Sequence, residues 1–370
     1  AAEDVPRGLD PYGADGVTRV DATVTAVDPI ECGGGSVGPD NVPTVDGACG
    51  QVTATTDDDE TAEFTLDPAR FTAGIEVGDA IKVLRIQPPG QEASYEFLDF
   101  QRGVPLAVLA GAFALSVVAI ARWRGLFAML GIGITLLALT QFILPAILAG
   151  RSPLLVAIIG STVIMIAVLY LAHGVSVRTT AALFGTLFGI AITASIGVLG
   201  TDLSSITGVG SEDDRLLLGT VPTLDLSQVA AATMVIAGLG VLNDVTVTQA
   251  SAVWEMRGFQ PTASRTRVFT SAMRIGRDHI ASSVYTLVFA YAGSAMTILL
   301  LVSAYQQNLV MVATTEEIGQ EVVRTLVGAI GLVLAVPVTT LIAVWLVPRG
   351  RADEPEPTYS GRRVAPPEHA

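Results

Sequence analysis

The stretch GLGVLNDVTVTQASAVWE, residues 238–255, decides the fold class of this chain. It begins like a helix suited to lipid and then places Asn243 and Asp244 where more Leu or Val would be expected. On a helix of 3.6 residues per turn, Asp244 shares one face with small and polar residues only, namely Thr233, Ala237, Gly240, Thr248, Ser251 and Glu255. We therefore expect this face to lie against protein or a water-filled cavity.

Inserting this helix into a membrane is marginal. A central Asp costs about 3 kcal/mol, and each Val, Ile or Leu returns roughly 0.5 kcal/mol. The apolar residues between Val229 and Leu242 therefore offset about one Asp and leave little for Asn243. The helix needs polar partners, and Asp278 and His279 stand at the start of the next apolar segment.

Two interpretations of these polar residues remain open. In one, they line a path for a proton, an ion or a polar substrate, because ionisable residues inside a membrane usually have a function. The residues of this hypothetical path are Asn243, Asp244, Thr248, Ser251, Glu255, Asp278, His279, Ser283 and Thr286. In the other, Asp244 is a structural residue that is hydrogen-bonded to Thr or Ser across a tight helix interface.

The composition is that of a membrane protein, with 51% hydrophobic and only 15% charged residues. A soluble protein carries about 25% charged residues. We predict a helical bundle in residues 101–348, with seven segments long enough to cross a bilayer: 104–121, 126–148, 154–172, 181–199, 229–249, 280–304 and 325–347.

The loops between these segments predict the orientation. One side would receive twelve arginines, Arg122, Arg124, Arg178, Arg257, Arg265, Arg267, Arg274, Arg277, Arg349, Arg351, Arg362 and Arg363, and the other only Arg151, Arg215 and Arg324. Because cytoplasmic loops are enriched in Lys and Arg, residues 1–100 are expected outside the cytoplasm and the C-terminus inside.

Residues 1–100 are expected to form a separate acidic β domain. They contain 20 acidic and 5 basic residues, which argues against nucleic acid as a partner. Short alternating segments between turn formers predict a small barrel or sandwich of OB-like kind. Cys32 and Cys49 are most simply a disulfide, with two free buried thiols as the alternative.

Three further segments carry predictions. The connection 255–279 is rich in Arg and would be either a helix on the inner membrane surface or a solvated basic loop, and its Arg267, Arg274 and Arg277 could bind a partner. The loop 200–227 would be solvated or a partly re-entrant cap. The tail 349–370 is expected to be disordered. We find no metal cluster, cofactor motif or enzyme motif and expect none of these functions.

Four stretches carry a resemblance to known proteins: YEFLDFQRGVPL (95–106), GVLNDVTVTQASAVWE (240–255), IGRDHIASSVYTLVFAYAG (275–293) and LVGAIGLVLAVPVTT (326–340). Through them the chain resembles the YibE/F-like family of bacterial multi-pass membrane proteins. The family's small–hydrophobic–Asp core corresponds to Leu242, Asn243 and Asp244, and its Gly-Arg-Asp to Gly276, Arg277 and Asp278. It implies a permease-like architecture in a bacterial inner membrane and no established substrate.

Two functions fit these observations. The bundle could transport a small solute or ion, with Asp244 as the coupling carboxylate. Alternatively, the chain could be a non-catalytic scaffold or accessory subunit that binds an envelope complex through its β domain and the basic 255–279 segment. An enzyme acting on lipid or cell wall is a more distant alternative. Beyond the lipid bilayer, a homo-oligomer or an envelope protein is an expected partner.

Overall fold

The computed structural model describes residues 16–32, 45 and 47–348. The predicted tail 349–370 and its disorder lie outside the described residues. The chain divides into two compact units, one that ends at Ile120 and one that begins at Ala121. The sequence predicts a domain boundary near residue 100, between the β domain and the first apolar helix. In the structure, residues 103–120 belong to the same compact unit as the β domain.

The first unit contains a five-stranded antiparallel sheet with the strand order β3-β2-β1-β4-β5. Its elements are β1 (Val17–Ile30), β2 (Cys49–Thr56), β3 (Thr61–Leu66), α1 (Pro68–Thr72), β4 (Ala80–Ile86) and β5 (Ser94–Phe100). Alternation of residue type explains the strands: in β3, Ala62, Phe64 and Leu66 are buried and the residues between them are exposed.

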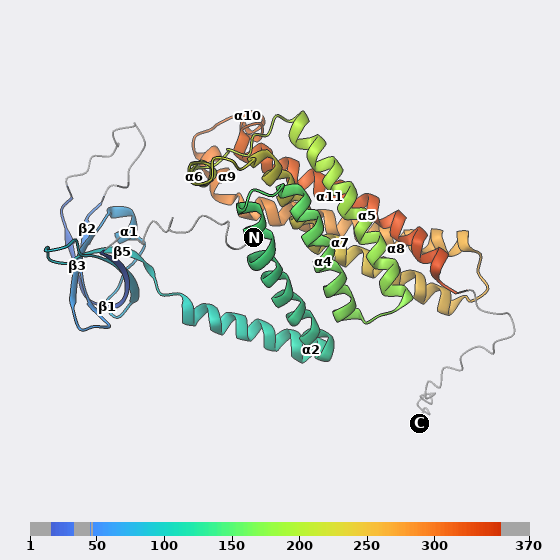
Figure 1. Ribbon diagram of the computed structural model, residues 1–370, viewed down its shortest axis with the longest axis horizontal. Helices are drawn as coiled ribbons and strands as arrows, with labels where there is room; N and C mark the ends of the chain where they lie inside the picture. Colours follow the sequence, from blue (N-terminus) through green and yellow to red (C-terminus); the bar gives the residue numbers. More distant parts are fainter. Residues whose placement is uncertain (1–15, 33–44, 46, 349–370) are drawn as a thin grey trace, which may run out of the picture. The chain divides into compact units, whose positions relative to one another are not determined.

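The sheet curls, so its two edge strands approach each other. The rings of Phe64 on β3 and Phe97 on β5 have centroids 6.1 Å apart. Phe64 also belongs to the hydrophobic core together with Val24, Val52 and other buried residues of the sheet. The curled sheet thus encloses one small core (Figure 1).

The disulfide prediction is confirmed. Cys32 and Cys49 are bonded, with Cα atoms 5.6 Å apart and 17 residues apart in sequence. The bond joins the end of β1 to the start of β2, two strands that are already paired from Ala22–Thr56 to Ile30–Cys49. It therefore links the central strand of the sheet, β1, to its neighbour β2 at the end where the chain passes between them.

Among the described residues, five helical runs are long and apolar enough to cross a membrane, or six if one bent pair counts as a span. They are Gly103–Leu148, which consists of α2 (Gly103–Ala138) followed by η1 and α3, and α4 (Pro153–His173), α5 (Val177–Leu203), α7 (Leu226–Phe259) and α11 (Glu316–Leu346). The bent pair is α8 (Arg265–Ser294) with α9 (Met296–Ala304), which meet at 63°.

Two of the seven predicted spans, segments 104–121 and 126–148, fall within the run Gly103–Leu148, so the number of spans stays a prediction. The two segments correspond to two helical parts that meet at a kink, because the backbone of Arg122 is not helical, with φ 53° and ψ −132°. The run also contains a π-helical turn, η1 (Leu139–Ile143), before α3 (Leu144–Leu148). Whether its two halves cross a membrane separately stays a prediction.

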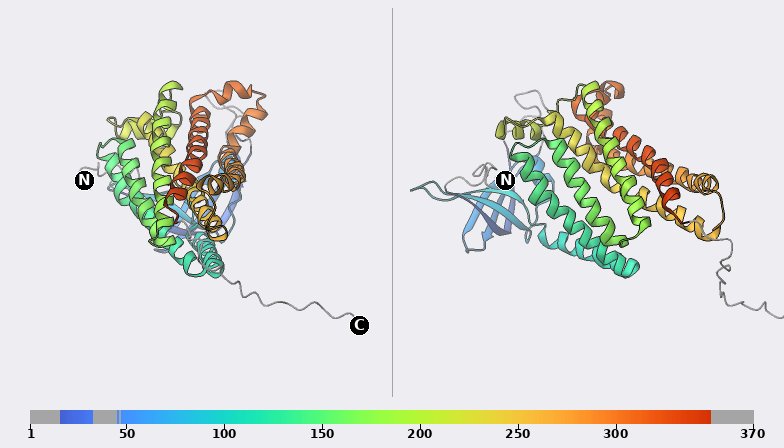
Figure 2. Two further views of the ribbon diagram at one scale, coloured as in Figure 1. Left: turned by 90° about the vertical axis from the view of Figure 1, so that its right-hand side faces the viewer. Right: turned by 45° about the vertical axis from the view of Figure 1, so that its right-hand side comes forward.

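Helices α5, α7 and α11 form the centre of the second unit, and α4 and α8 flank them (Figures 1 and 2). Glycines let the central helices approach closely. A Cβ on Gly185 of α5 would lie 2.8 Å from Cβ of Thr339 on α11, and one on Gly189 would lie 2.6 Å from a methyl carbon of Leu242 on α7. Such close contacts stabilise helix pairs in a membrane, where apolar burial gives little driving force.

The segment 255–279 is neither a helix on a membrane surface nor a solvated loop. Helix α7 continues to Phe259 and α8 begins at Arg265, so only five residues connect them. Val268 and Ala272 are buried in a cluster with residues of α5, α7 and α11. The apolar side of this segment packs inside the bundle, because α8 is one helix from Arg265 onward.

The loop 200–227 contains a short helix, α6 (Glu212–Thr220), capped by Ser211 and Asp214. Glu316, in the first turn of α11, fastens the beginning of this loop. Its Oε1 accepts hydrogen bonds from the backbone N–H of Thr207 (2.7 Å), the backbone N–H of Gly208 (2.9 Å) and the hydroxyl of Thr207 (3.1 Å). The end of α5 is thereby tied to the start of α11.

Candidate functional site

Asp244 and His279 form a polar pair between two neighbouring helices. Oδ2 of Asp244 on α7 lies 3.3 Å from Nε2 of His279 on α8. The atoms are close enough for an ion pair when His279 is protonated, but they are not aligned as a hydrogen bond, and Nε2 has no other partner within the described residues. The pair can hold or exchange a proton between α7 and α8.

The side chain of Asp244 is 67% exposed in the single chain, and that of His279 is 28% exposed. The sequence predicts that the bundle shelters this carboxylate, and within one chain that prediction is wrong. The reason is the packing of α7: Leu242, Val245 and Thr246 fill the core, so Asp244 points away from it. Across the apolar part of α7, the exposed positions are Ala237, Gly240 and Asp244.

The other predicted path residues are not gathered around this pair. Ser283, one turn beyond His279, is buried, whereas Thr286 is exposed and its hydroxyl donates to the carbonyl of Ser282. Ser251 lines a small cavity with His173 and residues of α5. The remaining path residues are Thr248, which is half-buried, and Glu255 and Asp278, which are exposed.

Asn243 lies beside Asp244 but turns its side chain elsewhere. Its Oδ1 is buried and has no hydrogen-bond partner within the described residues. Its backbone carbonyl accepts a hydrogen bond from the Thr246 hydroxyl at 3.3 Å. The Asn-Asp sequence thus places two polar groups on different sides of α7.

The bundle contains a second set of polar groups that the sequence pattern did not predict. The hydroxyls of Thr186 on α5 and Thr246 on α7 lie 2.7 Å apart, and both residues are fully buried. Nε2 of the buried Gln249 donates to the carbonyl of Ala272 on α8 at 2.9 Å. Thr246 and Gln249 are three residues apart, so they share a face that a helical projection of 238–255 could have identified.

Gly276 explains one residue of the Gly-Arg-Asp sequence in α8. A Cβ at this position would lie 2.9 Å from Oε1 of Gln249 and 2.9 Å from a methyl carbon of Val336 on α11. The lack of a side chain therefore lets α8 pack against α7 and α11 next to the Gln249 hydrogen bond. Arg277 and Asp278, in contrast, are exposed.

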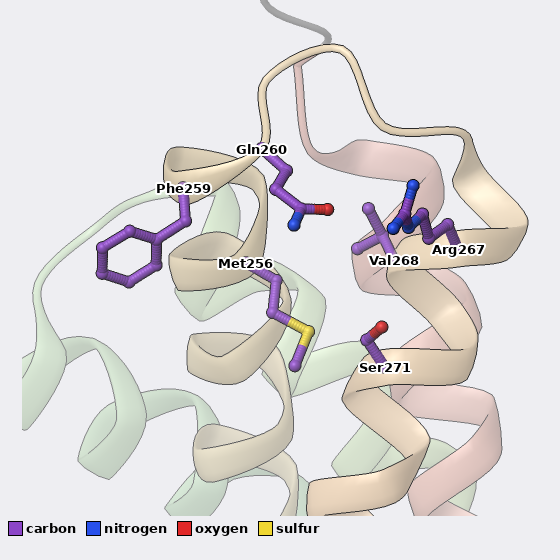
Figure 3. Close-up of a pocket in the computed structure, with 6 residues that line it drawn as sticks. All are labelled: Met256, Phe259, Gln260, Arg267, Val268 and Ser271. Atoms are coloured by element: carbon purple, nitrogen blue, oxygen red, sulfur yellow. The ribbon is translucent and has the colours of Figure 1, made fainter. Parts of the chain in front are cut away.

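A basic end of the bundle surrounds the turn between α7 and α8. Arg267, Arg274 and Arg277 are exposed on α8. Arg257 is buried and donates to the carbonyls of Pro261 and Ala263, which holds the turn. A cavity of about 160 Å³ lies between the helices (Figure 3), lined by Met256, Phe259, Gln260, Arg267, Val268 and Ser271.

A larger polar cavity lies at the break between α8 and α9. It has a volume of about 330 Å³ and is lined by Ser294 and Ala295 at the break and by Asp214, Glu317 and Glu321. Arg324 also lines it and pairs with Glu321 at 2.6 Å. Within the described residues, no group of three or more His, Cys, Asp or Glu could hold a metal ion.

The β unit has its own polar cluster. The hydroxyl of Tyr95 donates to Oε2 of Glu60 at 2.5 Å, and Arg85 binds the same carboxylate at 3.0 Å. The Tyr95 hydrogen bond, and secondarily Arg85, hold the pKa of Glu60 below its usual value. Burial, followed by the hydrogen bond to Glu60, raises the pKa of Tyr95. This cluster joins β4, β5 and the residue before β3.

Comparison with known proteins gives one result. No curated protein and no solved structure matches the chain. The model of the YibE/F-like protein family matches residues 109–349. This range contains the stretches 240–255, 275–293 and 326–340, the pair of Asp244 and His279 and the three cavities described above; the stretch 95–106 precedes it. Because the match covers more than half of the sequence, the chain belongs to the YibE/F-like family.

Proposed function

We propose that this membrane protein is a secondary-transporter-like permease that couples the movement of a small solute or ion to Asp244. The observation that carries the proposal is the 3.3 Å approach of the Asp244 carboxylate to the His279 imidazole, from two different apolar helices. A carboxylate and an imidazole at this distance can pass a proton or bind a cation as their protonation changes. The proposed role requires no enzyme chemistry.

The broken helix α8–α9 supports the proposal. Transporters often place their binding sites where a membrane helix is interrupted. The polar cavity lies at Ser294 and Ala295, and His279 lies fifteen residues earlier on α8. At a rise of 1.5 Å per residue, the two positions are about 22 Å apart along the helix. One helix would thus connect a polar cavity near one membrane surface with the Asp244–His279 pair farther along α8.

The proposed orientation follows from the arginines. With the Arg-rich loops in the cytoplasm, the β unit and the cavity at the α8–α9 break face the outside of a bacterial inner membrane. The Cys32–Cys49 disulfide supports an oxidising location for the β unit. The acidic residues of the cavity would then be accessible to cations outside the cell.

An OB-like fold is our proposal for the β unit. Its support is the strand order β3-β2-β1-β4-β5, the approach of β3 to β5, and the position of α1 between β3 and β4. OB-folds are five-stranded, partly open barrels that bind ligands on their strands and loops. In this protein the unit would collect or gate the substrate.

Flux measurements in proteoliposomes test the transport proposal. We expect Asp244→Asn to reduce proton- or cation-coupled flux about tenfold or more, equivalent to at least roughly 1.4 kcal/mol of barrier. The matched control is Asp213→Asn, which removes an exposed carboxylate in α6. Equal flux of every tested cation and of protons in wild type and Asp244→Asn would refute the coupling role.

The scaffold is the alternative function, and the basic end of α8 favours it. Arg267, Arg274 and Arg277 are exposed there, and Arg267 lines the cavity of Figure 3. If this surface binds a protein, changing all three to Glu should remove a stoichiometric partner from preparations of native membranes. Arg215→Glu, on exposed α6, is the control. Purification of the wild type without any partner would count against the scaffold.

A further inference from the structure

We infer that a second copy of this chain covers the face of α7 and α8 that carries Asp244 and His279, so that each copy contributes to both polar pairs. This inference rests on the proposed function, because it completes the same site. Asp244 is a carboxylate in an apolar helix, and the chain itself leaves its side chain 67% exposed.

The residues around Asp244 are unlike those on an outward face suited to lipid. On α4, the exposed positions Leu155, Ile159 and Val163 are large and apolar. On α7, the exposed positions near Asp244 are Ala237 and Gly240, and a Cβ at Gly240 would meet no atom within 4 Å. Small residues leave room for another helix to approach closely.

The adjacent side of α8 has the same character. Thr286, Ala290 and Gly293 follow His279 at helical spacing, and all three are exposed. The small residues of α7 and α8 therefore border the polar pair from both helices. The polar pair lies at one end of this surface, because the small residues precede Asp244 on α7 and follow His279 on α8.

The charge of Asp244 indicates what covers this face of α7 and α8. Lipid chains cannot solvate a carboxylate. The other candidate from this chain is the helical segment 103–120, which contains no charged residue; its Ser116 hydroxyl is bonded to the carbonyl of Ala112. A second copy, in contrast, brings both an imidazole and a carboxylate of its own.

A two-fold axis along the membrane normal would make the two faces complementary. Such an axis places residue i of one copy opposite residue j of the other, and j opposite i. Asp244 of one copy would lie opposite His279 of the other, and the reverse contact would follow by symmetry. Four titratable groups would then share protons inside the dimer, screened from lipid by the small residues around them.

Cysteine cross-linking in native membranes tests the dimer. Gly240→Cys is a suitable variant because its side chain enters open space, and both natural cysteines are bonded to each other. Gly133→Cys on α2 is the matched control, since a Cβ there also meets no atom within 4 Å. We expect mild oxidation to convert most of Gly240→Cys, and little of Gly133→Cys, to a species of twice the mass that reduction reverses.

Two results would overturn the dimer. In the first, Gly240→Cys stays monomeric under oxidation and the wild type has the mass of a single chain in lipid nanodiscs. In the second, the double variant Gly240→Cys and Gly111→Cys forms a cross-link within one chain. The latter would place the segment 103–120 on this face. The cross-linking readout is independent of flux. A dimer without Asp244-dependent flux would refute only the proposed function, and Asp244-dependent flux without a dimer would refute only this inference.

Discussion

Gly185→Ala tests the close contact between α5 and α11. A Cβ at Gly185 would lie 2.8 Å from Cβ and 2.9 Å from Cγ2 of Thr339, and it would also collide with the Thr339 hydroxyl. Thr339 cannot rotate away freely, because it is fully buried and its hydroxyl donates to the carbonyl of Ala335 at 2.7 Å. The two helices would have to separate.

The expected loss of stability follows from these distances. Carbon atoms pack at about 3.5–4.0 Å, so the contact is too short by roughly 1 Å. Overpacking of this kind costs about 1–3 kcal/mol, and three colliding atoms favour the upper end. The better helix propensity of Ala returns about 1 kcal/mol. We therefore expect Gly185→Ala to lower the free energy of unfolding by about 1–2 kcal/mol.

Reversible unfolding in detergent micelles measures this loss. Gly328→Ala on α11 is the control, because a Cβ there meets no atom within 4 Å, and it should be neutral or slightly stabilising. Thr339→Ala in the Gly185→Ala background removes two of the three colliding atoms, so a double-mutant cycle should show a favourable coupling of about 0.5–3 kcal/mol. Equal stability of Gly185→Ala and Gly328→Ala would refute the packing argument.

Three further predictions concern other contacts. Thr246→Val should lower the free energy of unfolding by about 1 kcal/mol in the same micelle assay, because the Thr186 hydroxyl loses its interhelical partner. Reducing the disulfide should destabilise the β unit by about 3 kcal/mol, seen as an earlier strand-unfolding transition in circular dichroism. Tyr95→Phe should destabilise the β unit at neutral pH. Because the folded pKa of Glu60 is lowered, that difference should vanish as the pH falls through it, and a difference unchanged at pH 2 would contradict this.

Much of the helical architecture was predictable because it depends on long-range hydropathy. The apolar segments 154–172 and 181–199 correspond to α4 and α5 within a few residues at each end. The ends of α7 and α8 were less predictable. Both helices extend into the Arg-rich segment 255–279. Arg257 holds the turn between them by donating hydrogen bonds to the carbonyls of Pro261 and Ala263, and a contact of this kind cannot be predicted from hydropathy.

The polar site was predictable only in part. Sequence reasoning selected Asp244 and His279, and the structure places them 3.3 Å apart. It did not find Thr246 and Gln249, whose partners lie on α5 and α8 and are distant in sequence. It also expected Asp244 to be covered by its own chain. Tertiary contacts decide which side of a helix faces the core, and they therefore also decide which side is left exposed.

The carboxylate of Glu316 limits where this bundle can bend. Glu316 fastens the loop after α5 to the first turn of α11, and the Gly185–Thr339 contact locks the same two helices closer to the start of α5 and the end of α11. Two helices clamped at two heights behave as a rigid body. Bending of the bundle is therefore disfavoured between α5 and α11 and is more readily accommodated at the break between α8 and α9, where the backbone already turns by 63°.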